Sequence, residues 1–242
     1  MTHYVSWLVA FGGDRAALSS SEVPMQITLN NVSYSYPGST QTVLDGVCTV
    51  FPVGWTGIIG NNGCGKSTLA RIATGMLAPD SGTVSPRGLV VAYCEQDATI
   101  PPDRLEDFAC SWEQTAVRLR VDLGIDDDWP WRYDTLSSGQ QKRLQVAVAL
   151  WENPDALVMD EPTNHVDVLT RRAILRALAG YRGIGLLISH DRELLDALAG
   201  QCLCFEGARV VMRSGGYAQA RGQAACDTKT AQRQRRDAKC EV

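Results

Sequence analysis

The stretch from residue 60 to residue 67 reads GNNGCGKS and has the residue types of a phosphate-binding loop. It fits the pattern G-x-x-x-x-G-K-[ST] at every defined position. Gly60, Gly63 and Gly65 allow the backbone to turn tightly and to point its N–H groups inward at phosphate oxygens. Lys66 is expected to reach the β- and γ-phosphates, and the Ser67 hydroxyl to hold Mg²⁺. The loop therefore predicts a nucleotide site.

The segments on either side of this loop have the pattern that such a loop needs. The apolar run over 55–60 predicts a strand, and the run STLARIAT over 67–74 predicts a helix whose N-terminus faces the phosphates. Without these neighbours, a glycine-rich run could be an ordinary turn. Four further positions of the loop and first helical turn are expected to contact the nucleotide: Asn61, Asn62, Cys64 and Thr68.

A second apolar run ends in two carboxylates. Residues 156–161 read ALVMDE, which predicts a buried parallel strand with Asp160 at its carboxyl end, where open α/β sheets bind ligands. Asp160 is expected to hold Mg²⁺ directly or through water, and Glu161 to orient and deprotonate the attacking water. The plainer alternative is a strand followed by an acidic turn.

Three shorter motifs are weak when each is taken alone. LSSGQ at 136–140 precedes an amphipathic helix pattern, so it offers free N–H groups at a helix N-terminus. His190 follows the apolar run 184–188 and could contact a γ-phosphate, and Gln96 follows the strand-like run 89–93. Ordinary alternatives are a loop or cap for Ser-Ser-Gly, a capping or core position for His190, and no role for Gln96.

Over residues 25–217 the chain resembles an ATP-binding cassette (ABC) domain. The resemblance lies in five motifs that occur in the expected order: GNNGCGKST, Gln96, LSSGQ, ALVMDEPTNHVD and SHDR. EPTNHVD at 161–167 and YDTLSSGQQKR at 133–143 resemble the ABC-F branch, whose members are cytoplasmic ATPases that act on ribosomes without a transmembrane partner. The resemblance implies an α/β fold: a P-loop NTPase cassette with an antiparallel β subdomain, a RecA-like parallel-sheet core and a small helical subdomain.

The resemblance also implies roles for individual residues. Tyr36 matches the aromatic residue that stacks on adenine, with Tyr34 as the second choice. Gln96 matches the residue that senses Mg²⁺ and the attacking water, His190 the switch histidine, and Asp167 the loop that crosses between two cassettes. The expected catalytic residues are Glu161, His190, Gln96 and Lys66, and the expected metal-site residues are Ser67, Gln96 and Asp160.

Ser137, Gly139 and Gln140 match the signature that closes over the nucleotide of the opposite cassette. In ABC proteins, one ATP lies between the phosphate loop of one cassette and the signature of another. This chain has one of each, so the resemblance implies a partner cassette, either a second copy in a head-to-tail dimer or a missing second half. ATP with Mg²⁺ would bridge the two cassettes in the closed state, and hydrolysis would let the two cassettes separate.

Three features depart from the family pattern. Ser138 replaces the commoner second glycine of LSGGQ, and the chain has one cassette where ABC-F proteins usually have two. Cys64 occupies a loop position where serine is more usual. A helix N-terminus and Lys66 are expected to lower the pKa of this thiol, which predicts inactivation by thiol reagents and protection by ATP. A buried, unreactive cysteine is the alternative.

The composition agrees with one globular domain and its extensions. The chain has 242 residues, 45% of them hydrophobic and 21% charged, which is enough to bury a full core. Its net charge of -4 is not the positive charge typical of a nucleic-acid-binding protein. No apolar run approaches the ~20 residues of a membrane span. The eight cysteines are scattered without a C-x-x-C pair, which indicates free thiols and a cytoplasmic protein.

The two ends differ from the cassette. Residues 1–24 are expected to be a loose extension, since no basic residue precedes their short apolar stretch as in a secretion signal. Residues 218–242 are locally basic and resemble the first turns of the helical linker that follows the first ABC-F cassette, where basic side chains could follow RNA phosphates. A frayed, solvated tail is the alternative.

The expected order of elements is an antiparallel β portion over 25–57, short strands near 83–93, a helical region over 103–152, parallel strand–helix units over 156–199 and a hairpin near 201–213. The function that follows is an ATP-hydrolysing ABC-F cassette acting on ribosomes, with rRNA or tRNA contacts, in translation regulation or antibiotic resistance. Two alternatives stay open: the ATP-binding subunit of an ABC transporter, and an incomplete cassette with little turnover. The small helical region argues against the transporter, and the single cassette keeps the second alternative open.

Overall fold

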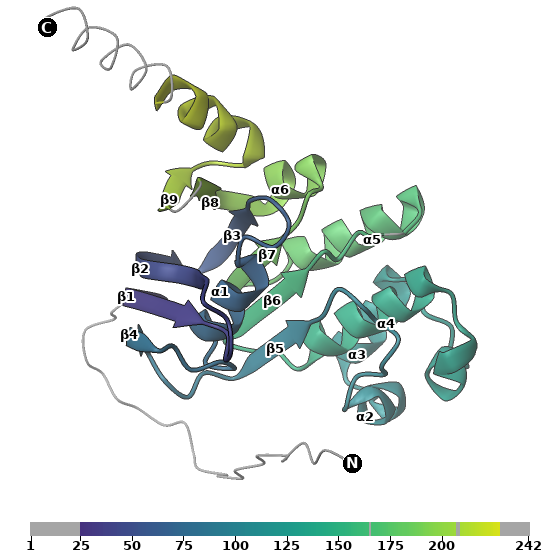
Figure 1. Ribbon diagram of the computed structural model, residues 1–242. Helices are drawn as coiled ribbons and strands as arrows, with labels where there is room; N and C mark the ends of the chain where they lie inside the picture. The colour runs from purple at the N-terminus through teal and green to yellow at the C-terminus, as the bar shows by residue number, and fades with distance from the viewer. Residues whose placement is uncertain (1–24, 165, 207–208, 228–242) are drawn as a thin grey trace, which may run out of the picture.

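Two sheets and a lobe of helices make up the computed structural model, which describes residues 25–164, 166–206 and 209–227 (Figure 1). The extension expected over 1–24 lies outside the described residues, as does the part of the basic tail after residue 227.

Three strands form the antiparallel sheet, in the order β2-β1-β4: β1 (Gln26–Ser35), β2 (Thr42–Pro52) and β4 (Ser81–Ser85). Apolar side chains alternate along β1, so Ile27 and Leu29 are buried on one face. The antiparallel portion expected over 25–57 is therefore right only as far as Pro52. The next strand, β3 (Gly54–Ile59), pairs in parallel with β7 and β8 in the other sheet, since its four central residues are buried on both faces.

The second sheet has six strands in the order β5-β6-β7-β3-β8-β9. Their bounds are β5 (Val91–Cys94), β6 (Ala156–Asp160), β7 (Ile184–Ile188), β8 (Ala199–Glu206) and β9 (Arg209–Ser214), together with β3. Neighbours are parallel from β5 to β8, and β8 and β9 form the expected antiparallel hairpin. Every residue of β6 and β7 is buried, as the unbroken apolar runs predict.

Helices cover both faces of the six-stranded sheet. On one face, α1 (Lys66–Ala73) and the antiparallel sheet share a core with Val158 and Leu186. On the other, α4 (Ser138–Trp151), α5 (Val168–Ala179) and α6 (Arg192–Leu198) share a core with Leu157 and Leu187. Successive strand residues point to opposite faces, which divides the apolar side chains between the two cores.

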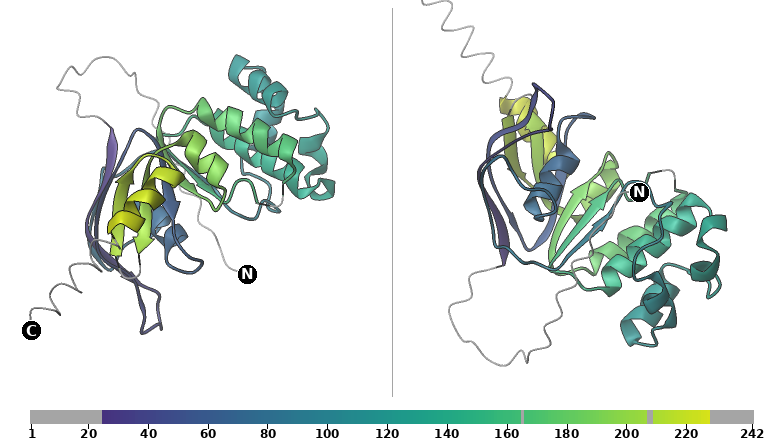
Figure 2. Two further views of the ribbon diagram at one scale, coloured as in Figure 1. Left: turned by 90° about the horizontal axis from the view of Figure 1, so that it is seen from above. Right: turned by 60° about the horizontal axis from the view of Figure 1, so that its bottom comes forward.

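The helical lobe lies beside the sheet and contains α2 (Leu105–Cys110), α3 (Gln114–Asp122), the 3-10 helix η1 (Trp129–Thr135) and the start of α4 (Figure 2). This is the helical region expected over 103–152. Together with the two sheets, it confirms the predicted fold class.

A last helix, over residues 217–227, follows β9. Ala220 is fully buried and packs with Ala199, Cys202 and Cys204, and Arg213 Nη1 lies 2.7 Å from Asp227 Oδ2. The described part of the basic tail therefore packs on the cassette instead of fraying from it. None of the helices described here is both long and apolar enough to cross a bilayer.

Candidate active site at the carboxyl ends of the strands

The predicted site residues converge because β5, β6, β7 and β3 are parallel neighbours whose carboxyl ends lie at one edge of the sheet. The phosphate loop follows β3, Gln96 follows β5, Asp160 and Glu161 lie at the end of β6, and His190 follows β7. A cavity of about 350 Å³ lies between them. Its lining includes Asn62, Gly63, Lys66, Ser67, Gln96, Asp160, Glu161, Asn164 and His190.

The phosphate loop requires glycine at two positions at least. Gly65 has φ of +104°, and a Cβ built there would lie 2.8 Å from Val43 Cγ1. A Cβ on Gly60 would lie 2.6 Å from Cys64 Sγ. Any larger residue would therefore strain the backbone or push the loop apart, which accounts for the spacing seen in the sequence.

Lys66 closes the loop from inside. Its side chain is 8% exposed, and Nζ donates hydrogen bonds to the carbonyl oxygens of Gly60 at 3.0 Å and Asn61 at 2.9 Å. The ammonium therefore lies inside the turn, beside the backbone N–H groups that follow Asn61. Phosphate oxygens entering the loop would replace these two neutral carbonyl acceptors by negatively charged ones, which an ammonium binds more strongly.

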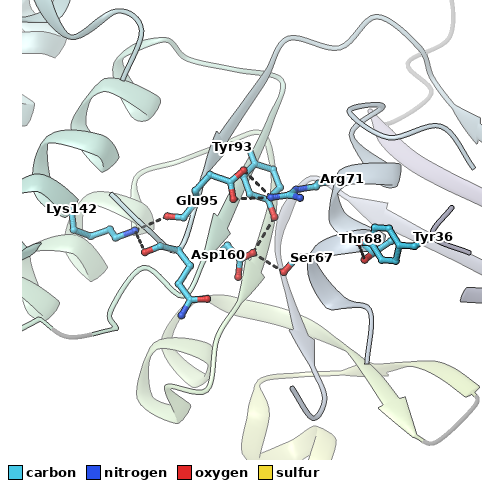
Figure 3. A network of polar contacts seen from close by, with 9 residues as sticks. Tyr36, Ser67, Thr68, Arg71, Tyr93, Glu95, Lys142 and Asp160 are labelled. Carbon is cyan, nitrogen blue, oxygen red and sulfur yellow. Dashed lines mark hydrogen bonds and ion pairs between the residues drawn. The ribbon is translucent and has the colours of Figure 1, made fainter. Parts of the chain in front are cut away.

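Ser67 and Asp160 meet although 93 residues separate them. Ser67 Oγ donates to Asp160 Oδ2 at 2.7 Å, and Asp160 is 6% exposed (Figure 3). With Gln96 on the same cavity, the donors are a hydroxyl, a carboxylate and an amide, which are hard oxygen ligands of the kind that Mg²⁺ takes. The residues present therefore fit a magnesium ion, and Ser67, Asp160 and Gln96 are the ones that would hold it.

Glu161 lies at the turn that ends β6, with φ of +47°. Its N–H donates to Ile188 O at 2.8 Å, and its Oε2 accepts from the backbone N–H of His190 at 3.3 Å. His190 Nε2 lies 3.6 Å from Glu161 Oε1 and 3.0 Å from Asn62 Oδ1. Burial raises the pKa of Glu161 above its usual value, and His190 opposes that rise. A raised pKa makes the carboxylate a stronger base for accepting a proton from water.

Tyr34, in β1, and Tyr36, which follows that strand, have different surroundings. Tyr34 is 6% exposed and belongs to the core, whereas Tyr36 is 46% exposed. The Tyr36 hydroxyl lies 2.8 Å from Thr68 Oγ1, in the first turn of the helix that follows the phosphate loop (Figure 3). Of the pair, Tyr36 is therefore the ring that a base could stack on, and Tyr34 is not.

The signature residues lie apart from the cavity around Lys66. Ser137 caps α4, because its Oγ accepts from Gln140 N at 3.3 Å and its own N–H donates to Gln140 Oε1 at 2.9 Å. The cavity that the phosphate loop lines is not lined by Ser137, Gly139 or Gln140. Asp167 caps α5 and accepts from Leu169 N and Thr170 N. The fold therefore does not bring the signature to the phosphate loop of the same chain.

Sequence reasoning missed a buried lysine that positions Gln96. Lys142 is 3% exposed, and its Nζ donates to Glu95 O at 2.7 Å, Gln96 O at 3.1 Å and Gln145 Oε1 at 2.8 Å. Burial lowers the pKa of Lys142. These bonds join α4, which begins at the signature, to the backbone of Gln96. A lysine on the apolar side of the α4 pattern was the available signal, but the two carbonyls that it binds, those of Glu95 and Gln96, follow β5 and are distant in sequence.

The structure corrects the expectation for Cys64. Burial raises the pKa of its thiol above the usual value, and this effect outweighs the opposite influence of Lys66. The prediction of a lowered pKa is therefore wrong, because desolvation disfavours the thiolate more than a nearby ammonium favours it. Cys202 and Cys204 are buried free thiols, and no cluster of three or more potential metal ligands (His, Cys, Asp or Glu) occurs in the described part of the chain.

We expect Cys64 to react with iodoacetamide at neutral pH about 10-fold more slowly than the exposed Cys110, because a raised pKa leaves less thiolate. Its rate should climb as the pH rises toward that pKa. Mass spectrometry of labelled peptides over time measures both sites in one sample. Equal or faster labelling of Cys64 would contradict the burial argument.

Comparison with known proteins supports the assignment of this cavity as a nucleotide site. The sequence pattern of the ABC transporter family matches residues 47–164. The ATP-binding protein Uup of Escherichia coli (strain K12) is 35% identical over 209 residues, which are 81% of this chain and 33% of that protein. The energy-dependent translational throttle protein EttA of Haemophilus influenzae is 32% identical over 79% of this chain and 37% of its own length.

The ribosome protection protein VmlR of Bacillus subtilis (strain 168) is 33% identical over 79% of this chain and 33% of its own length. The chain thus spans about a third of the length of these relatives. Among solved structures, a dimeric ATP-binding cassette in a post-hydrolysis state with ADP and Pi has a TM-score of 0.67 and 19% identity, covering 78% of this chain and 98% of that one. The ATP-binding subunit of an ABC transporter also has a TM-score of 0.67, with 20% identity, over 78% of this chain and 90% of that subunit.

The likeness to solved structures shows the fold. The sequence relatives are proteins of the ABC-F branch, which is the branch that the EPTNHVD run resembles. The motif order, the convergence of most of the motifs at one edge of the sheet and these matches lead to one conclusion: residues 47–164 carry an ABC transporter family domain, that is, an ATP-binding cassette, and the chain is similar in sequence to ABC-F proteins.

Proposed function

We propose that this cassette works in an ABC-F type protein that acts on the ribosome, in translation regulation or in antibiotic resistance. The observation that carries the proposal is sequence similarity over about four-fifths of the chain to relatives named for a translational throttle and for ribosome protection. The EPTNHVD run at the end of β6 supports it. Such a protein would work in the cytoplasm.

In the proposed mechanism, Tyr36 stacks on adenine and the phosphate loop receives the phosphates. Lys66 leaves the carbonyls of Gly60 and Asn61 and donates to phosphate oxygens instead. Mg²⁺, when bound, neutralises charge on the β- and γ-phosphates. Glu161 accepts a proton from the attacking water, and its position is fixed by the backbone N–H of His190. His190 and Gln96 complete the cavity wall around the γ-phosphate.

A second cassette is part of the proposal. Ser137, Gly139 and Gln140 lie away from the Lys66 cavity of their own chain, so they would serve the nucleotide of a partner. The partner is a second copy of this cassette or a second half of a longer chain. In either case ATP is shared between two surfaces and favours the closed pair over the open one.

The division of the chain is also proposed: a cassette over 25–217, and a basic helical tail over 218–242 that resembles the start of an interdomain linker. Residues 217–227 are helical and packed on the cassette, which supports a helix that continues from it. Locally basic residues in the tail would approach rRNA or tRNA.

Co-sedimentation with ribosomes tests the proposal. Glu161→Gln should trap the ATP-bound closed state, so we expect it to pellet with ribosomes in the presence of ATP and to stay in the supernatant without it. The matched control is Glu106→Gln, which changes an exposed glutamate of α2 and should pellet no more with ATP than the wild type does.

The other outcomes are equally informative. If Glu161→Gln forms an ATP-dependent dimer but does not co-sediment with ribosomes, the ribosome role is refuted and the transporter-subunit alternative is favoured. Neither dimer nor ribosome binding, with nucleotide binding intact, would favour a cassette that binds ATP with little turnover in the absence of its second half.

A further inference from the structure

The carboxylate of Asp160 has a second hydrogen-bond donor that none of the motifs contains. The Tyr93 hydroxyl donates to Asp160 Oδ2 at 3.1 Å, and Ser67 Oγ donates to the same oxygen at 2.7 Å (Figure 3). Within the described part of the chain, both hydrogen bonds that the Asp160 side chain accepts end on Oδ2. The two donors come from different elements, β5 and the start of α1.

Two donors on one oxygen fix the orientation of a carboxylate. Rotation of the Asp160 group would break both bonds, and Asp160 is 6% exposed, so water could replace them only in part. The arrangement holds Oδ2 on Ser67 and Tyr93, and Oδ1 accepts no hydrogen bond from the described part of the chain. A metal site depends on such outer partners, because they orient the groups that hold the ion.

Tyr93 is itself held in place. The Arg71 guanidinium lies 5.4 Å from the centre of the Tyr93 ring, and Arg71 Nη2 lies 3.0 and 2.9 Å from the two carboxylate oxygens of Glu95. Arg71 and Ser67 are four residues apart on α1 and so lie on the same side of the helix.

We propose that Tyr93 is a positioning residue of the magnesium site: its hydroxyl orients the Asp160 carboxylate through Oδ2, while β5 also leads into Gln96 three residues later. Tyr93 thus connects two groups that would hold the ion, one at the end of β6 and one after β5. The inference rests on the proposed magnesium site formed by Ser67, Asp160 and Gln96.

Tyr93→Phe removes the hydroxyl and keeps the ring under Arg71. We expect the affinity for Mn²⁺, measured by electron paramagnetic resonance in the presence of ADP, to fall about 10-fold, the loss expected for a hydrogen bond to a charged group. Affinity for a fluorescent ATP analogue in EDTA should stay within about 2-fold, because the hydroxyl that is removed donates to Asp160 and, within the described part of the chain, to no residue of the phosphate loop.

Tyr181→Phe is the matched control. Tyr181 is also buried and its hydroxyl donates to Pro154 O at 3.0 Å, but it precedes β7 and so lies at the opposite end of the sheet. This variant should lose one buried hydrogen bond and bind Mn²⁺ as the wild type does. Thermal melting of both variants shows whether each is folded.

Wild-type Mn²⁺ affinity in a folded Tyr93→Phe chain would overturn the role of Tyr93. If that variant does not fold, Arg71→Ala tests the proposal instead. This change removes the partly exposed guanidinium that lies against the Tyr93 ring. An unchanged Mn²⁺ affinity in this variant would overturn the proposal. A wild-type chain whose nucleotide binding shows no dependence on Mg²⁺ or Mn²⁺ would refute the magnesium site itself, which is a distinguishable result.

Discussion

Replacement of Glu161 with Gln is expected to lower steady-state ATP hydrolysis by about 10²- to 10⁴-fold, the range for loss of a general base. The amide has the same size and can still accept the hydrogen bond from the backbone N–H of His190, which the carboxylate accepts at 3.3 Å. It cannot accept a proton from water. ATP binding should therefore remain, and release of phosphate from radiolabelled ATP measures the loss.

The loss at Glu161 should be specific to the chemical step. Equilibrium binding of a fluorescent ATP analogue to Glu161→Gln should match the wild type within about 2-fold, since no interaction with the phosphate loop is removed. Glu106→Gln should hydrolyse ATP normally. Wild-type turnover by a folded Glu161→Gln chain would show that another group accepts the proton, and it would remove Glu161 from the proposed mechanism.

Lys66→Ala is expected to weaken ATP binding by about 10- to 100-fold, because hydrogen bonds to a charged group are the strong ones. Wild-type Lys66 is 8% exposed and lies inside the loop, where its ammonium donates to the carbonyls of Gly60 and Asn61, so these two acceptors compete with phosphate for it. A fluorescent ATP analogue titrated into each chain measures the difference. Arg118→Ala, at an exposed side chain of α3, is the control and should bind normally.

Mixing two inactive variants tests whether the site is shared between copies. In a head-to-tail dimer of one Lys66→Ala chain and one Gly139→Trp chain, one composite site contains both changes and the other contains neither. Mixtures should therefore regain about a quarter of wild-type hydrolysis, since about half of random dimers are mixed and each has one intact site. No recovery, with dimers present, would contradict sharing between copies.

Much of the fold could be predicted because it depends on local patterns. The unbroken apolar runs of β6 and β7 required burial on both faces, and the glycines of the phosphate loop required a tight turn between a strand and a helix. Motifs that follow parallel strands were expected to meet at one edge, and the cavity lined by Lys66, Asp160 and His190 lies there. The antiparallel portion expected over 25–57 extends too far, into the first residues of β3, which pair in parallel with β7 and β8, since a short apolar strand does not by itself select its neighbours.

The residues that could bind a phosphate, orient a water and hold a cation could be predicted from the sequence, because each motif is a few residues long and lies at one strand end or one helix start. Contacts between distant side chains could not be predicted in this way, since Tyr93 meets Asp160, and Lys142 meets the carbonyls after β5, through the folding of the chain. The same holds for Cys64, where burial outweighs Lys66. Desolvation and hydrogen bonds between distant segments depend on what packs around a group, and no local pattern contains that information.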